Sequence, residues 1–224
     1  MKHALTITTL SIASSFGASV VLSEHDFDSN NSGLNAGNGG AVLTTISDPT
    51  GSGLGNVGSV NIGGAAPVWG EIRTTPIGHT LPVGTVAGVD SITASFDIYV
   101  PSSTTFSSAG AGTDRVNLII RQSSGPDNGN RVSPGSSNNN WNTLTQDTWQ
   151  TISVNVPISA VDNASQPITE LTPILSFYDP ADPAADGVAA YIDNWSFSVT
   201  NTVPEPASAL LIVLSGLGLI RRRR

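Results

Sequence analysis

The chain has 224 residues, a formal net charge of −8 and no cysteine. This length fits one globular domain with appendages, and the acidic balance argues against nucleic acid as a partner, because phosphates would not be neutralised. Without cysteine there are no disulfides, thiolate metal sites or cysteine nucleophiles.

The first 23 residues have the composition of a secretory signal peptide. Lys2 and His3 precede a mostly apolar run from Ala4 to Phe16, and small residues follow. A basic start, a short apolar run and a small-residue cleavage zone are typical of such peptides. We predict a signal helix over residues 1–23, with cleavage between Gly17 and Ser23. The alternative is a first core strand or helix.

Residues 24–202 show period-two alternation and no sustained helical spacing. Strands are predicted over 91–100, 115–121, 149–156 and 191–199, with weaker candidates over 41–46, 57–62, 68–73 and 172–178. Short strands with one apolar face predict an all-β fold of two packed antiparallel sheets. The segment 122–147 is long for a structureless loop, so it either contains a hairpin or is functional.

The last 22 residues, 203–224, combine a proline-rich triplet, an uncharged run over 207–220 and four terminal arginines. The run is short for a membrane span, but the arginines favour an anchor with a cytoplasmic end. This order resembles the PEP-CTERM sorting signal. The resemblance implies transient insertion in the inner membrane of a Gram-negative bacterium that makes exopolysaccharide, and processing by an exosortase. The residues that carry it are Pro204, Glu205, Pro206, Arg221, Arg222, Arg223 and Arg224.

The central region resembles a second family. The motifs DFDS (26–29), TWQTISV (148–154) and YIDNWSFSV (191–199) look like those of the galactose-binding-like jelly roll. Many carbohydrate-binding modules use that fold. The expected architecture is therefore an antiparallel β-sandwich of jelly-roll type, flanked by an N-terminal signal helix and a C-terminal hydrophobic helix.

Asp193 is the first candidate site residue. It lies between Tyr191 and Trp195 on the predicted core face of the last strand, where an ionised carboxylate needs a compensating partner. The jelly-roll resemblance implies a structural calcium ion joining the last strand to the start of the domain, with Asp28 and Glu24 as further ligands. The alternative is that Asp193 caps backbone N–H groups.

A second candidate site consists of outward polar and aromatic side chains. Sugars are bound by aromatic faces and by planar polar groups. Arg115, Asn117 and Arg121 are expected in a row on one sheet face, with Tyr99 as a candidate on the neighbouring strand and Trp141 in the long loop. The alternative is that these residues are surface charges and core-edge aromatics.

The alternation within single strands also predicts the positions of several other aromatic and charged residues. Trp69, Glu71 and Arg73 share one face of a candidate strand. Trp149 and Trp195 are predicted to lie in the core, because each belongs to an apolar strand face.

No motif indicates an enzyme. The chain has no G-x-S-x-G elbow and no phosphate-binding loop. We expect an exported, non-catalytic protein of the cell surface or extracellular matrix that binds polysaccharide. The alternatives are a purely structural or adhesive surface protein and, less favoured, a polysaccharide-active enzyme. Residues 19–203 alone contain 4 basic and 16 acidic residues, so this part carries a net charge of −12.

Overall fold

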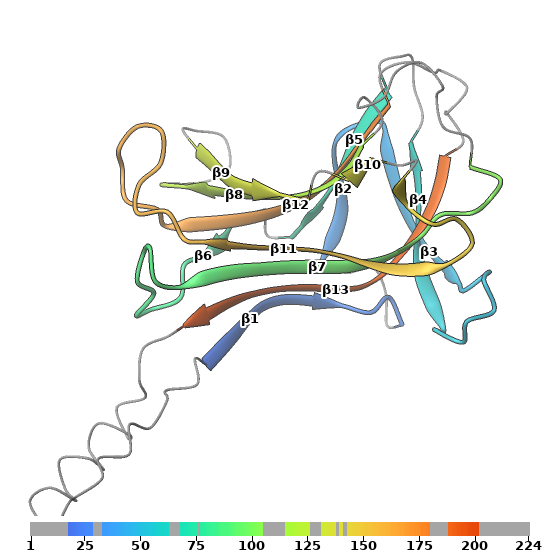
Figure 1. Ribbon diagram of the computed structural model, residues 1–224, viewed down its shortest axis with the longest axis horizontal. Coiled ribbons are helices and arrows are strands. Elements are labelled where there is room, and N and C mark those ends of the chain that lie inside the picture. The colour runs from blue at the N-terminus through green and yellow to red at the C-terminus, as the bar shows by residue number, and fades with distance from the viewer. Residues whose placement is uncertain are drawn as a thin grey trace, which may run out of the picture. The chain divides into compact units, whose positions relative to one another are not determined.

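A computed structural model describes residues 18–28, 33–62, 68–75, 77–104, 115–125, 131–137, 139–140, 143–179 and 188–201. Residues 19–201 form one compact unit (Figure 1). Residues 1–17 of the predicted signal helix, the predicted C-terminal helix and Trp141 fall outside the described residues. Residues 18–23 of the predicted signal helix belong to a strand instead. Within the described ranges, no helix has the length and apolarity needed to cross a membrane.

The first sheet has six strands among the described residues, and β13 occupies a central position in it. In spatial order the strands are β11 (Trp149–Pro157), β7 (Ser91–Tyr99), β13 (Val188–Asn201), β4 (Asn56–Ile62) and β3 (Ala41–Ser47), while β1 (Ala18–His25) also pairs with β13. The long pairings β11–β7 and β13–β7 are both antiparallel.

The second sheet packs against the first and has β12 at its centre. Its spatial order is β10 (Asn139–Asn140), β8 (Arg115–Ser123), β12 (Glu170–Asp179), β5 (Val68–Thr74) and β2 (Leu34–Gly39), with β6 (His79–Thr80) paired to β12 and β9 (Arg131–Ser136) to β8. The segment 122–147 supplies β9, which forms a hairpin with the end of β8, so it is not a structureless loop. The predicted two-sheet antiparallel sandwich is confirmed.

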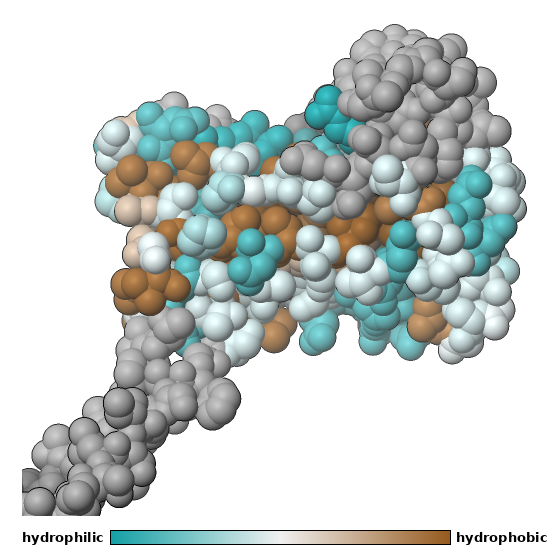
Figure 2. Space-filling model, in the orientation of Figure 1, coloured by the Kyte–Doolittle hydropathy of each residue, from teal (hydrophilic) through white to brown (hydrophobic). Residues whose placement is uncertain are grey.

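The core lies between the sheets and follows from strand alternation. On β7, Ile92, Ala94, Phe96 and Ile98 are fully buried, and the residues between them are half-buried on the other side. Strand β8 repeats this pattern from Val116 onward. In the space-filling view, a band of apolar side chains runs across the molecule between polar surfaces (Figure 2).

A β-bulge in β13 corrects the predicted face of the last strand. The pairing with β7 shifts register between Asp193 and Ser196, and Asn194 adopts a left-handed φ of 49°. Before the bulge Ile192 is the core residue, and after it Trp195 is. Asp193 pairs with Asp97 on the side away from the core. The prediction that Asp193 shares the core face with Trp195 is therefore wrong, because one inserted residue reverses the alternation.

Strand β1 begins inside the segment 1–23 assigned to the signal peptide. It starts at Ala18, and Leu22 packs against the core cluster. The indole Nε1 of Trp195 donates a hydrogen bond to Ser23 Oγ at 3.0 Å. The predicted boundary between residues 23 and 24 thus falls within a strand that contacts the domain core.

Candidate functional site

The outer surface of the second sheet carries most of the predicted sugar-binding residues. On β5, β8 and β12, core residues such as Ile72, Leu118 and Leu175 alternate with side chains that point away from the first sheet. We call this outer surface the arginine face. Its residues are Glu71, Arg73, Arg115, Asn117, Ile119, Arg121, Arg131, Thr172, Ile174 and Ser176.

An ionic cluster lies at the centre of the arginine face. Arg73 donates from Nε to Glu71 Oε2 at 2.9 Å, and its Nη2 also contacts that oxygen. Arg121 Nη2 lies 3.5 Å from Glu71 Oε1. The exposed fractions of the Glu71, Arg73 and Arg121 side chains are 6%, 10% and 17%. One carboxylate thus orients two guanidinium groups.

Asn117 supplies an unused acceptor beside this cluster. Its Oδ1 atom is buried and accepts no hydrogen bond from the part of the chain that the structure describes. Buried acceptors are nearly always hydrogen-bonded, since an unsatisfied one costs about 1–3 kcal/mol. This oxygen has almost no accessible surface of its own, so a ligand does not reach it in this conformation.

Two cavities flank the ionic cluster. The larger, of about 430 Å³, is lined by Ile119, Arg121, Ser133, Gly135 and Ser136. The smaller, of about 290 Å³, is lined by Asn35, Ala36, Gly37, Arg73, Thr74, Thr75 and Ile77. The arginine face therefore offers space, hydroxyl groups, fixed charges and an apolar wall at Ile119 within one surface.

The structure brings together only part of the predicted sugar-binding set. Arg115, Asn117 and Arg121 lie in a row on β8, as expected. Tyr99 does not join them, because β7 belongs to the other sheet. Glu71 and Arg73 were expected to share a strand face, but their link to Arg121 was missed. It depends on β12 lying between β5 and β8, which alternation within one strand does not reveal.

Tyr99 instead belongs to an aromatic row on the outer surface of the first sheet. Its ring centroid lies 5.7 Å from that of Trp149 on β11 and 6.1 Å from that of Tyr191 on β13. Burial and the neighbouring Asp147 carboxylate raise the pKa of Tyr99. Trp149 is half-buried in this row, so its predicted core position is wrong, whereas that of Trp195 is confirmed. Cross-strand aromatic pairs of this kind stabilise a sheet.

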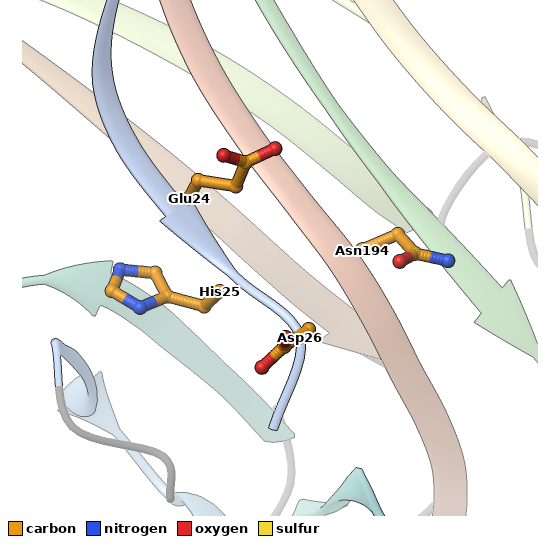
Figure 3. A pocket seen from close by; sticks show the side chains of 4 residues that line it. All are labelled: Glu24, His25, Asp26 and Asn194. Carbon is orange, nitrogen blue, oxygen red and sulfur yellow. The ribbon is translucent and has the colours of Figure 1, made fainter. Parts of the chain in front are cut away.

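An acidic cavity of about 470 Å³ lies where β1 ends beside β13. Glu24, His25, Asp26 and Asn194 line it (Figure 3). Phe27 anchors the end of β1, because it is fully buried at a left-handed φ of 58°. Gly58 leaves room for the Phe27 ring, since a Cβ there would lie 2.6 Å from Cζ.

Asp193 lies in the same region and is strongly perturbed. It is only 2% exposed, and its Oδ1 has no hydrogen-bond partner among the described residues. Burial disfavours its charged form, and Asp28, Asp97 and Asp26 add like-charge repulsion, which together raise the pKa of Asp193 to about 6. A hydrogen bond from the Asn194 backbone partly opposes this shift.

The predicted calcium ligands form an incomplete set. The buried Asp193 oxygen fits a cation ligand, because no group in the described part of the chain donates a hydrogen bond to it. Asp28, however, accepts a hydrogen bond from the Asn56 backbone at 3.0 Å, and Glu24 is exposed on β1. Among the described residues, no three carboxylate or imidazole groups are arranged to hold a metal ion. Backbone oxygens would have to complete any calcium site here.

Comparison with known proteins shows the fold. No protein-family model matches the chain, and neither does any curated protein. Among solved structures, the CBM22-1–CBM22-2 tandem domain of Paenibacillus barcinonensis Xyn10C superposes with a TM-score of 0.51 at 17% identity. The chain has the fold of these carbohydrate-binding modules. The match covers 80% of this chain and 50% of the tandem domain, so the chain corresponds to half of that protein.

The single CBM22-2 domain of the same Xyn10C, described as xylan-binding, is also similar. It shows 16% identity and a TM-score of 0.48 over 80% of this chain and 99% of the module. The arginine face of this chain lies on the outer side of the sheet that lacks β1 and β13.

Proposed function

We propose that the protein binds polysaccharide on the arginine face, without catalysis. The observation that carries this proposal is the row of Arg115, Asn117 and Arg121 on β8, which the Arg73–Glu71–Arg121 cluster joins to β5. Guanidinium groups donate, carboxylates accept and amides do both, so this set matches a surface of sugar hydroxyls. Ile119 gives the larger cavity an apolar wall for the C–H face of a sugar ring.

The names of the similar structures support the same proposal. They are carbohydrate-binding modules, one of them described as binding xylan. They differ from this chain at more than four-fifths of aligned positions, so the choice of sugar must come from this chain's own residues.

Asn117→Ala tests the arginine face directly. Affinity gel electrophoresis of the full chain in mild detergent, against xylan, mannan, cellulose derivatives and polyuronates, identifies a retained polysaccharide. We expect Asn117→Ala to weaken that affinity about tenfold, because a hydrogen bond between a sugar and the half-buried amide group is worth about 1–1.5 kcal/mol. Asn155→Ala, the same change on the outer surface of the first sheet, is the matched control and should retain full affinity.

Three results would contradict the proposal of non-catalytic binding on the arginine face. If the Asn117→Ala variant and the unaltered protein bind with equal affinity, the arginine face is not the binding surface. Self-association or cell attachment without retention by any polysaccharide supports a structural or adhesive protein instead. Release of reducing ends or ester products would reveal an enzyme.

We further propose export and sorting through the two ends of the chain. The signal-like leader and the PEP-CTERM-like tail support transfer across the inner membrane, processing by an exosortase and delivery to the cell surface or extracellular matrix of a Gram-negative bacterium. We propose leader cleavage at the start of the 17–23 window, and the contacts of Leu22 and Ser23 with the domain support this position.

We also propose that one calcium ion binds at Asp193. The buried orphan oxygen and the carboxylates of Asp26, Asp28 and Asp97 nearby support a cation there. At calcium concentrations about 100 times Kd, binding should raise the melting temperature by about 5–10 °C. Differential scanning calorimetry in CaCl₂ and in EDTA measures this difference.

Asp193→Ala should abolish the calcium-dependent rise, while Asp147→Ala, a carboxylate outside the cluster, should preserve it. Identical melting temperatures in CaCl₂ and EDTA would show that the folded protein does not bind calcium.

A further inference from the structure

A loop at one end of the sandwich exposes three valines. Residues 81–90, between β6 and β7, present Val83, Val86 and Val89, whose exposed fractions are 100%, 42% and 59%. We call this segment the valine loop. Its single charged residue is Asp90, which is fully buried. The exposed part of the valine loop therefore carries no charge, and a group of apolar side chains projects at this end of the molecule (Figure 2).

A framework of hydrogen bonds fixes the shape of the valine loop. It contains two consecutive tight turns, 82–85 and 86–89, each closed by a backbone hydrogen bond of 3.2 Å between its first and fourth residues. Gly84 and Gly88 occupy the third positions with φ values of 88° and 75°, a left-handed conformation that favours glycine. The buried Asp90 carboxylate accepts a hydrogen bond of 2.7 Å from the backbone of the same loop. None of these contacts uses a valine side chain, so the folding of the loop does not explain why its exposed residues are apolar.

The valine loop lies beside the point at which the chain leaves the described domain. Ser91 at the start of β7 pairs with Thr200 near the end of β13. The loop before β7 and the segment after β13 therefore leave the same end of the first sheet (Figure 1). A Cβ added to Gly84 would lie 3.6 Å from the Nδ2 atom of Asn201, the last described residue. The tip of the loop and the exit of the chain are thus neighbours.

The segment that follows Asn201 indicates what covers the valine loop. Ala207 begins the uncharged run over 207–220 that we propose as a membrane anchor. The six residue steps from Asn201 to Ala207 span at most about 22 Å when fully extended. An anchor inserted in a bilayer therefore holds the valine loop within reach of the lipid headgroups. Such a short tether raises the effective concentration of the loop at the membrane, so that even a weak contact is well populated.

We propose, building on the membrane anchoring proposed above, that the valine loop docks onto the lipid bilayer in which the C-terminal segment is inserted. Exposed apolar side chains enter the boundary between headgroups and acyl chains, and a loop without exposed charge avoids the cost of moving a charge there. The loop gives the domain a second attachment to the membrane. Because the contact is made at the strand ends, it leaves the outer surfaces of both sheets uncovered.

Site-specific fluorescence tests this contact, since a chain without cysteine can be labelled at a single introduced one. The full chain with Val83→Cys carries an NBD dye and is reconstituted in phosphatidylcholine vesicles. Doxyl-labelled lipid should quench this dye at least about twofold more strongly than the same dye on Ser103→Cys, because only the valine loop reaches the acyl boundary. Ser103 is the control, because it is exposed and lies beyond the opposite end of β7, a strand about 27 Å long.

Val83→Asp tests the valine itself. In protein labelled at Val89→Cys, this substitution should reduce quenching by doxyl-labelled lipid at least about twofold, because a charge at the tip opposes entry into the boundary. The melting temperature should not change, since Val83 is fully exposed. Val42→Asp is the matched control, because it adds the same charge at an exposed valine of β3 and should leave the quenching unchanged.

Flotation with the vesicles distinguishes a failure of docking from a failure of anchoring. If the full chain does not float, both the anchor and this inference are wrong. If it floats but the dyes at Val83→Cys and Ser103→Cys are quenched equally, the anchor stands and docking of the valine loop is wrong. Unchanged quenching in Val83→Asp would show that the valine makes no contact with lipid. A blue-shifted dye at Val83→Cys that the lipid quencher does not reach would replace the bilayer by a second copy of the chain.

Discussion

Replacing Trp195 with alanine is expected to lower the free energy of unfolding by about 3–5 kcal/mol. The side chain is 1% exposed, and its ring centroid lies 6.4 Å from that of Phe96 in the core. Its Nε1 also binds Ser23 Oγ, so the substitution opens a cavity and releases the contact between β13 and β1. Urea unfolding followed by circular dichroism measures the loss.

Trp149→Ala is the matched control for this prediction. The half-buried Trp149 packs on Tyr99 at the outer surface of the same sheet and donates to Thr50 Oγ1 at 3.1 Å. The Trp149→Ala substitution should lower the free energy of unfolding by about 1–2 kcal/mol, because it leaves no enclosed cavity. Equal losses for the two tryptophans would contradict the assignment of one to the core and the other to the surface.

The second large effect is expected in the pH dependence of stability. The pKa of Asp193 is about 6 in the folded state, against about 3.9 when unfolded. Between these values the folded state binds more protons, so the free energy of unfolding falls as pH rises from 4 to 7. In EDTA the total fall is at most about 3 kcal/mol.

Asp193→Asn should flatten this profile and make the variant more stable than the unaltered protein at pH 7. Asp147→Asn is the control. Hydrogen bonding to Ser102 lowers the pKa of Asp147, so the stabilisation that the Asp147 carboxylate gives the folded state is lost only at pH values below about 4. Urea unfolding in steps from pH 4 to 7 measures both. A profile of Asp193→Asn that parallels the unaltered protein would show that Asp193 is not buried as a charged group.

The strands with regular alternation were predictable from sequence, and those shaped by tertiary contacts were not. Strands β7 and β11 follow the polar–apolar pattern closely, because each has one face in the core. Strand β2 contains Asn and Gly where a strand usually has branched residues, and β1 lies in a leader-like segment. Both segments form strands because they pair with neighbouring strands, and no local sequence pattern predicts that pairing.

The candidate site was predictable along one strand but not across strands. The alternation of Arg115, Asn117 and Arg121 places them on one side of β8 from sequence alone. Their meeting with Glu71 depends on strand order, and Tyr99 was expected on the wrong sheet for the same reason. Asp193 was correctly expected to be buried, but the bulge at Asn194 put it on the opposite face.

The central position of β13 has a mechanical consequence. Hydrogen-bonded strands lie on both of its sides, β7 along one and β4 and β1 along the other. A pulling force applied through Asn201 acts along this strand, while antiparallel hydrogen bonds lie perpendicular to it. Many bonds must then shear together, whereas an edge strand would peel away one bond at a time. The domain should therefore resist unfolding when tension is applied at its C-terminal end.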